Sequence, residues 1–157
     1  MSFSNDLDPQ RADVMDAVRE AGSGWAVAMR AHKLAPPDPG FAERLRRLAQ
    51  AAAGEQVAWE NAHAAGLLWR PVPGAEGAEP PYELRPGTGR RGPASLWERF
   101  DRSVNALNRA IAGSNAAEVA DAFGAMAHVA GELADAVASD DEAAARASTD
   151  TRARGAA

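Results

Sequence analysis

The stretch VADAFGAMAHVAGELADAV, residues 119–137, carries the clearest structural signal in the chain. Its large or tolerated apolar residues recur every three or four positions, which is the spacing that places side chains on one face of an α-helix. These residues are Val119, Phe123, Met126, Ala130, Leu133 and Val137. The stretch therefore predicts an amphipathic helix that begins at Ser114 or Asn115 and packs its apolar face on other elements.

A first helix is predicted to open at Asp8-Pro9, where the aspartate caps the helix and the proline takes its first position. Pro36-Pro37 ends this segment. Gly22-Ser23-Gly24 lies within it, and we expect a kink or a break there. Its inner face is predicted to carry Val14, Val18, Ala21, Trp25, Ala28 and His32.

Two more helices show the same 3/4 spacing. One runs from about Pro39 to Ala65, and the other opens with a capping box at Ser95–Glu98 and stops at Gly113. Their inner faces are Phe41, Leu45, Leu48, Ala52 and Trp59 in the first case, and Trp97, Phe100, Val104, Leu107 and Ile111 in the second.

Four amphipathic helices predict an all-α fold, a four-helix bundle. We expect one domain over residues 1–138, with a long Pro/Gly/aromatic connection at 67–94 between the second and third helices. Short links make each pair of helices an antiparallel hairpin, whereas the long connection can stay at one end or cross the whole bundle, since it spans roughly 80 Å at ~3.3 Å per residue. Residues 139–157 hold no large apolar side chain, and we expect a disordered, flexible tail there.

The amino-acid composition excludes several classes of function. The net charge of −5 argues against non-specific nucleic-acid binding, which needs a basic face. The chain has no cysteine, so thiolate chemistry is excluded. No segment is apolar over the ~18 residues that a membrane span needs, and the N-terminus does not resemble a signal peptide. These features predict a cytoplasmic protein that does not bind membranes.

Motifs for catalysis or metal binding are weak. Glu60-Asn-Ala-His63 has the E-x-x-H spacing of di-iron bundles, but in a single copy. His128 and Glu132 form an i, i+4 pair that can act as acid and base, yet they belong to an acidic helix face typical of solvated bundles. Gly87-Thr-Gly89-Arg-Arg-Gly92 matches a dinucleotide-binding pattern without the strand that this fold requires. The sequence therefore predicts no catalytic residue, no cofactor and no bound metal.

The long connection is the best candidate for a binding surface, because it concentrates the aromatic and basic residues around it. If it stays at one end of the bundle, its flanking tryptophans gather there, and nearby arginines meet an anionic group. The candidate ligand- or partner-binding residues are Trp59, Trp69, Tyr82, Arg85, Arg90, Arg91 and Trp97.

Two functions fit this interpretation. The first is a non-catalytic helical module that acts by protein–protein contact, with another protein or with a second copy as a homodimer; an exposed apolar patch on the connection and the third helix favours it. The alternative is a module that binds or senses an anionic or aromatic small molecule at the end of the bundle that carries the connection.

Overall fold

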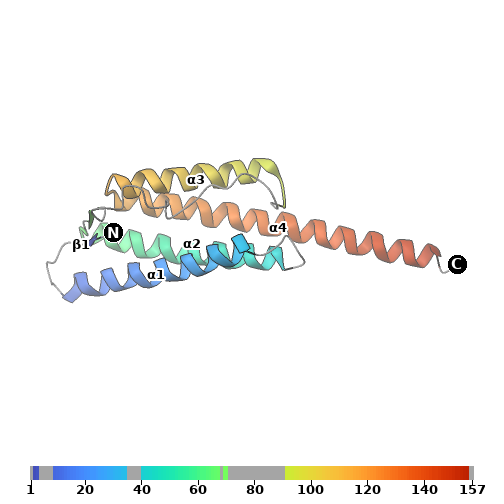
Figure 1. The fold of residues 1–157 in the computed structure, drawn as a ribbon, viewed down its shortest axis with the longest axis horizontal. Helices are drawn as coiled ribbons and strands as arrows, with labels where there is room; N and C mark the ends of the chain where they lie inside the picture. Colours follow the sequence, from blue (N-terminus) through green and yellow to red (C-terminus); the bar gives the residue numbers. More distant parts are fainter. Residues whose placement is uncertain (1, 4–8, 35–39, 68, 71–90, 156–157) are drawn as a thin grey trace.

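The computed structural model describes residues 2–3, 9–34, 40–67, 69–70 and 91–155 (Figure 1). Four helices make up nearly all of this part, namely α1 (Pro9–Leu34), α2 (Phe41–Ala64), α3 (Ala94–Ala112) and α4 (Ala116–Gly155). Two short strands, β1 (Ser2–Phe3) and β2 (Trp69–Arg70), pair antiparallel beside the helices. The predicted all-α fold of four packed helices is confirmed.

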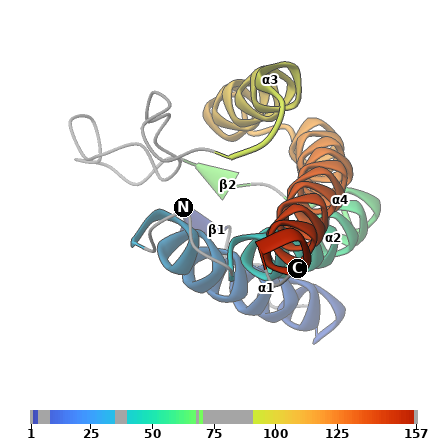
Figure 2. The same cartoon turned by 90° about the vertical axis from the view of Figure 1, so that its right-hand side faces the viewer.

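The helices follow one another in space in the order α1, α2, α4, α3. The most extensive packing is between α2 and α4, while α1 packs on α2 and α3 packs on α4. Seen end-on, the four helices lie around an arc (Figure 2). Each hairpin is antiparallel, as expected, and the two hairpins meet through α2 and α4.

One apolar core runs through the described helices, and the predicted stripes form it. All five predicted inner residues of α2 and all six of α4 are buried. On α1, Val18 and Trp25 are buried, and the edge of the Trp25 ring meets the Phe123 ring of α4 with centroids 5.3 Å apart. Alanine fills much of the remaining interface, which lets α2 and α4 approach closely.

The helix starts agree only partly with the sequence signals. Asn115 caps α4 as expected, because its Oδ1 accepts a hydrogen bond from the Glu118 backbone N–H at 3.1 Å. The predicted capping box at Ser95–Glu98 is wrong. The N-cap of α3 lies two residues earlier, at Pro93, so that the helix begins at Ala94, and there is no side-chain cap bond.

Of the kink or break expected at Gly22-Ser23-Gly24, the break is wrong, because helix α1 runs continuously through these residues. Gly22 faces α2, where a Cβ on it would lie 3.6 Å from Oε1 of Glu55. A glycine costs about 1 kcal/mol in a helix interior, a penalty that tertiary packing readily outweighs. A Cβ at position 22 would meet Glu55 only at ordinary van der Waals distance, so the contact between α1 and α2 does not require a glycine there.

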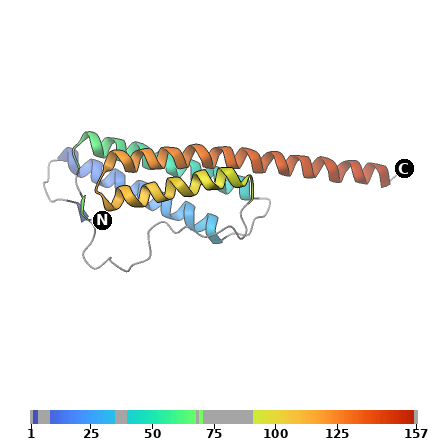
Figure 3. The same ribbon diagram turned by 90° about the horizontal axis from the view of Figure 1, so that it is seen from above.

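The two ends of the long connection lie at opposite ends of the bundle. Arg70 follows the C-terminal end of α2, whereas the Arg91 guanidinium lies 6.0 Å from the ring centre of Phe41, at the N-terminal end of α2. Those ends are about 36 Å apart at ~1.5 Å per residue. The connection is therefore a crossover, and α2 and α3 run in the same direction (Figure 3).

Helix α4 extends well beyond the other helices (Figure 1). Its residues 133–141 lie beside the starts of α2 and α3, since Asp135 lies 4.0 Å from Arg46 and Asp141 pairs with Arg91. From residue 142 to 155 every side chain is exposed. The expected absence of core beyond position 138 thus holds, but these residues are helical through Gly155 and do not form a disordered tail.

None of the helices in the described part of the chain combines the length and apolarity needed to cross a bilayer.

Candidate functional site

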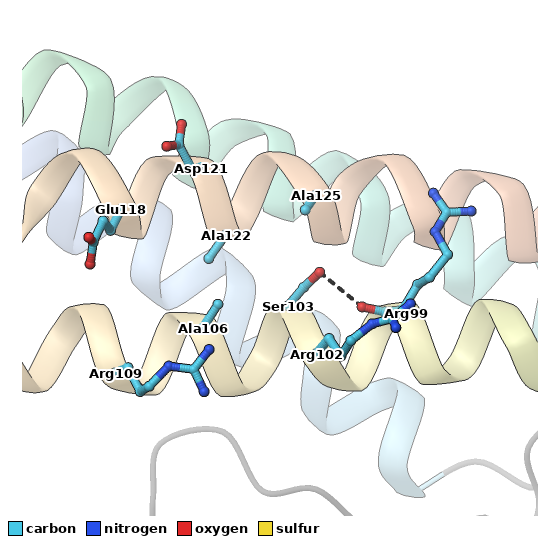
Figure 4. A pocket seen from close by; sticks show the side chains of 9 residues that line it. All are labelled: Arg99, Arg102, Ser103, Ala106, Arg109, Glu118, Asp121, Ala122 and Ala125. Atoms are coloured by element: carbon cyan, nitrogen blue, oxygen red, sulfur yellow. Dashed lines mark hydrogen bonds between the residues drawn. The ribbon is translucent and has the colours of Figure 1, made fainter.

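A groove of about 580 Å³ lies between α3 and α4 (Figure 4). Arginines from α3 form one wall and carboxylates from α4 form the other, while the floor consists of short side chains. The lining residues are Arg99, Arg102, Ser103, Ala106, Arg109, Glu118, Asp121, Ala122 and Ala125.

The groove follows directly from residue spacing on two antiparallel helices. Arg99, Arg102 and Arg109 recur at three and seven positions along α3, so they share one face of the helix. Opposite them, Ala122 and Ala125 present only methyl groups, too small to fill the space between the helix surfaces. A hollow with charged walls and a small-residue floor results.

The two walls do not neutralise each other. Within the described part of the chain, Arg102 and Arg109 form no ion pair with Glu118, Asp121 or any other carboxylate. The guanidinium groups of Arg102 and Arg109 and the carboxylate of Glu118 thus line the same open space, while the Asp121 carboxylate is directed away from α3 (Figure 4). Such a site can hold a ligand that bears an anionic group, or a ligand that carries charges of both signs.

At one end of the groove, Arg99 belongs to a charged cluster with two residues of α4. Its Nη1 donates to Oε2 of Glu132 at 2.8 Å, and Nε2 of His128 lies 2.7 Å from Oε1 of the same carboxylate. The hydrogen bond from Arg99 is the main cause that lowers the pKa of Glu132 below its usual value. Glu132 is therefore an ionised anchor for Arg99, and Arg102 and Arg109 are the cations that face a ligand.

The groove does not offer a nucleophile poised for attack. Ser103 is its only hydroxyl, and that hydroxyl donates to the backbone carbonyl of Arg99 at 3.0 Å (Figure 4). The predicted His128–Glu132 pair does form, but it shares its carboxylate with Arg99, so the arrangement is a salt-bridge cluster. These lining residues support binding.

Of the residues predicted to form a binding surface, the structure describes the side chains of Trp59, Arg91 and Trp97, and these are not all brought together. Trp59 lies in the core near the C-terminal end of α2, whereas Trp97 lies at the opposite end of the bundle, beside Arg91. The tryptophans were expected to gather only if the connection stayed at one end of the bundle, and the connection crosses the bundle instead. Trp69 lies in β2, and its side chain is outside the described residues, as are Tyr82, Arg85 and Arg90.

Trp97 and Arg91 have structural contacts with each other and with α4. The Trp97 indole donates to the carbonyl oxygen of Arg91 at 2.9 Å, and its ring meets Phe100 edge-on. The Arg91 guanidinium pairs with Asp141 and lies over Phe41. These two residues fasten the start of α3 to α2 and α4, and whether they also bind a partner stays a prediction.

The E-x-x-H motif of α2 lies on the outside of the bundle. Glu60 and His63 are both exposed, and Glu60 accepts a hydrogen bond from Gln56 at 3.1 Å. Within the described ranges, no three His, Cys, Asp or Glu side chains come together as a metal-binding group. Side-chain contacts of His32 lie outside the described residues.

A buried carboxyl group was not predicted from the sequence. Glu55 of α2 is only 1% exposed, and its Oε2 accepts a hydrogen bond from the Trp59 indole at 2.9 Å. Burial raises its pKa from 4.5 to about 7, with the Trp59 hydrogen bond acting in the opposite direction. The sequence does carry a signal for this burial, because position 55 lies on the apolar stripe between Ala52 and Trp59.

No protein-family model, curated protein or solved structure matches this chain.

Proposed function

We propose that this protein is a cytoplasmic, non-catalytic helical module that acts by contact with another protein chain. The observation that carries this proposal is the end of α4, where residues 142–155 continue as an exposed helix beyond the bundle. These residues continue a packed helix but have no packing of their own in the described chain, and helical stability in proteins comes mostly from tertiary packing. A partner chain that packs along them supplies the missing tertiary contacts.

The apolar patch expected on α3 is not the surface that supports this proposal. In the described part of the chain, the large apolar side chains that are well exposed are Val27 on α1 and Val57 on α2. Both are isolated residues on the outer faces of their helices, which is ordinary for a protein surface. We therefore propose the end of α4 as the contact surface.

Site-specific photo-crosslinking in the native host tests this function. A photoreactive amino acid at Ala145, which is exposed on the end of α4, is expected to give a discrete adduct with a second polypeptide. The same amino acid at Val57, which is 57% exposed on α2, serves as the matched control. Absence of any adduct from Ala145 contradicts the proposal.

The groove between α3 and α4 favours a second candidate function, the binding of a small anionic molecule. This places the ligand away from the predicted end of the bundle, because Arg102 and Arg109 face the groove without a carboxylate partner in the described chain. Titration with inorganic phosphate, followed by amide chemical shifts, is expected to perturb residues along the groove. An Arg102→Ala/Arg109→Ala variant loses these shifts, whereas Arg146→Ala on the end of α4 keeps them; equal responses contradict the candidate.

A further inference from the structure

The groove between α3 and α4 carries charges of both signs, and they are unevenly placed along it. Arg109 and Glu118 lie at one end, on facing helices, and Arg102 lies further along α3 (Figure 4). The two arginines are seven residues apart, or about 10 Å along the helix axis at ~1.5 Å per residue. One end of the groove therefore carries both signs, and the other carries positive charge from Arg102.

The two charges at the mixed end are stabilised by their own helices. The Asn115 side chain accepts a hydrogen bond from the Glu118 backbone N–H, and Glu118 lies in the first turn of α4, where the helix dipole favours a carboxylate. Arg109 lies in the last turn of α3, where the dipole favours a cation. Within the described part of the chain, neither side chain forms an ion pair with the other or with a third residue. Both remain available to a ligand.

Between the two charged ends, the floor of the groove is apolar. Ala106 of α3 and Ala122 of α4 point toward each other there, and Ala125 lies beside them on the side of Arg102 (Figure 4). Methyl groups offer no partner to a polar group, which is costly to remove from water without one. The middle of the groove therefore fits the methylene groups of a ligand.

The charges that the groove offers to a ligand are two positive and one negative. Arg102 and Arg109 supply the positive charges and Glu118 supplies the negative one, while Arg99 is taken up by Glu132. A ligand with two acid groups and one ammonium group matches each of these charges. A diacid without the ammonium group leaves Glu118 unmatched and brings a further anion close to it. The charge pattern thus favours a ligand that carries both signs.

We propose that the groove binds an amino acid whose side chain ends in a second acid group. The α-ammonium group contacts Glu118, the α-carboxylate contacts Arg109, and the distal carboxylate contacts Arg102, with the methylene groups over the alanines. This inference rests on the second candidate function, the binding of a small anionic molecule, and names the chemical class of the ligand. Arginine suits both acid groups, because one guanidinium can donate two hydrogen bonds to one carboxylate.

Three probes of equal chain length test the contacts separately. α-Aminosuberate carries all three charged groups, suberate lacks the ammonium group, and α-aminooctanoate lacks the distal carboxylate. Each is added to the full chain at low, constant ionic strength, because salt screens exposed charges, and amide chemical shifts along the groove are followed. α-Aminosuberate is expected to bind at least about threefold more tightly than either of the others, which is the range of a partly exposed ion pair.

Two variants are expected to remove these preferences one at a time, at exposed positions that do not contribute to the core. In Glu118→Gln, suberate is expected to bind as tightly as α-aminosuberate. In Arg102→Ala, α-aminooctanoate is expected to do so. Glu98→Gln replaces an exposed carboxylate of α3 that does not line the groove, so this control is expected to keep both preferences.

Suberate that binds the native chain as tightly as α-aminosuberate overturns the inference, and so does a preference that Glu118→Gln leaves unchanged. In either case, phosphate-induced shifts along the groove still support the second candidate function. A native chain in which neither phosphate nor any of the three probes shifts the groove amides overturns both.

Discussion

The two halves of α4 belong to one continuous helix but depend on different interactions. In residues 116–137, eleven side chains are buried in the core, and Ala130, Leu133 and Val137 among them are fully buried. In residues 142–155 no side chain is buried, and the contacts within the helix are hydroxyl–carbonyl bonds and exposed ion pairs. Helicity in the first half therefore comes from tertiary packing, whereas within the described chain the second half has only its local propensity and its continuity with the packed half, which leave it marginal.

The largest effect is expected from a cavity in the first half. Phe123→Ala removes a ring that is 1% exposed and packed edge-on against Trp25. Such truncations cost about 3–5 kcal/mol, a large share of the stability of a typical domain. Urea denaturation followed by tryptophan fluorescence measures the loss. Val57→Ala on the solvent face of α2 is the control, and a loss as large as that of Phe123→Ala contradicts the core position of Phe123.

The second prediction concerns the carboxyl group in the interior next to α4. Because the pKa of Glu55 is raised to about 7 in the folded chain, its contribution to stability is fully present below about pH 4.5 and is lost as pH rises through 7. Glu55→Gln keeps an acceptor for Trp59 but cannot ionise. The variant is therefore expected to exceed the native chain in unfolding free energy at about pH 8, by on the order of 3 kcal/mol, and to match it near pH 4.

Denaturation curves at both pH values check this expectation, with Glu60→Gln as the control. Glu60 is exposed five residues further along the same helix and differs from Glu55 in lacking burial. The stability of Glu60→Gln should follow that of the native chain at both pH values. A stability gap between Glu55→Gln and the native chain that does not change with pH is the result that refutes ionisation of a buried Glu55.

The smallest effects on stability come from the same type of substitution, alanine to glycine, made once in each half of α4. Because only the position differs, this pair compares the two halves directly. Ala134→Gly removes a fully buried methyl group and is expected to lower the unfolding free energy by about 1 kcal/mol or more. Ala145→Gly lies in the exposed end and should leave the unfolding transition of the monomer unchanged. Faster amide hydrogen exchange after residue 141 is its expected signature. Equal shifts of the transition by both variants show instead that α4 unfolds as one unit.

The fold could be predicted from the sequence wherever the spacing of apolar residues along a single helix was enough to define the element. The 3/4 spacing of apolar residues located all four helices, and the stripes of α2 and α4 match the buried residues. The helical end of α4 was missed because the absence of large apolar residues was interpreted as disorder. Its alanine, arginine and glutamate content, which favours helix, points the other way. Burial and helicity are separate properties, and here only burial was predicted correctly.

The site was less predictable, because it depends on distances between helices. Connection length alone allowed an end loop or a crossover, and contacts such as Arg91 on Phe41 decide between them. The groove requires the face of α3 that carries Arg102 to lie opposite the alanines of α4, which no local pattern encodes. Glu55 is different, since its stripe position predicts burial and only its charge argued against it.

The parallel course of α2 and α3 has a consequence for how the chain folds. Each hairpin is built from neighbours in sequence, so each can form early with a low entropic cost of loop closure. The α2–α4 interface, which is the most extensive, joins segments separated by the whole crossover and α3. Its formation is therefore the step with the longest loop to close. Folding kinetics should show rapid hairpin formation followed by a slower docking step, in which the core around Trp25 and Phe123 is completed.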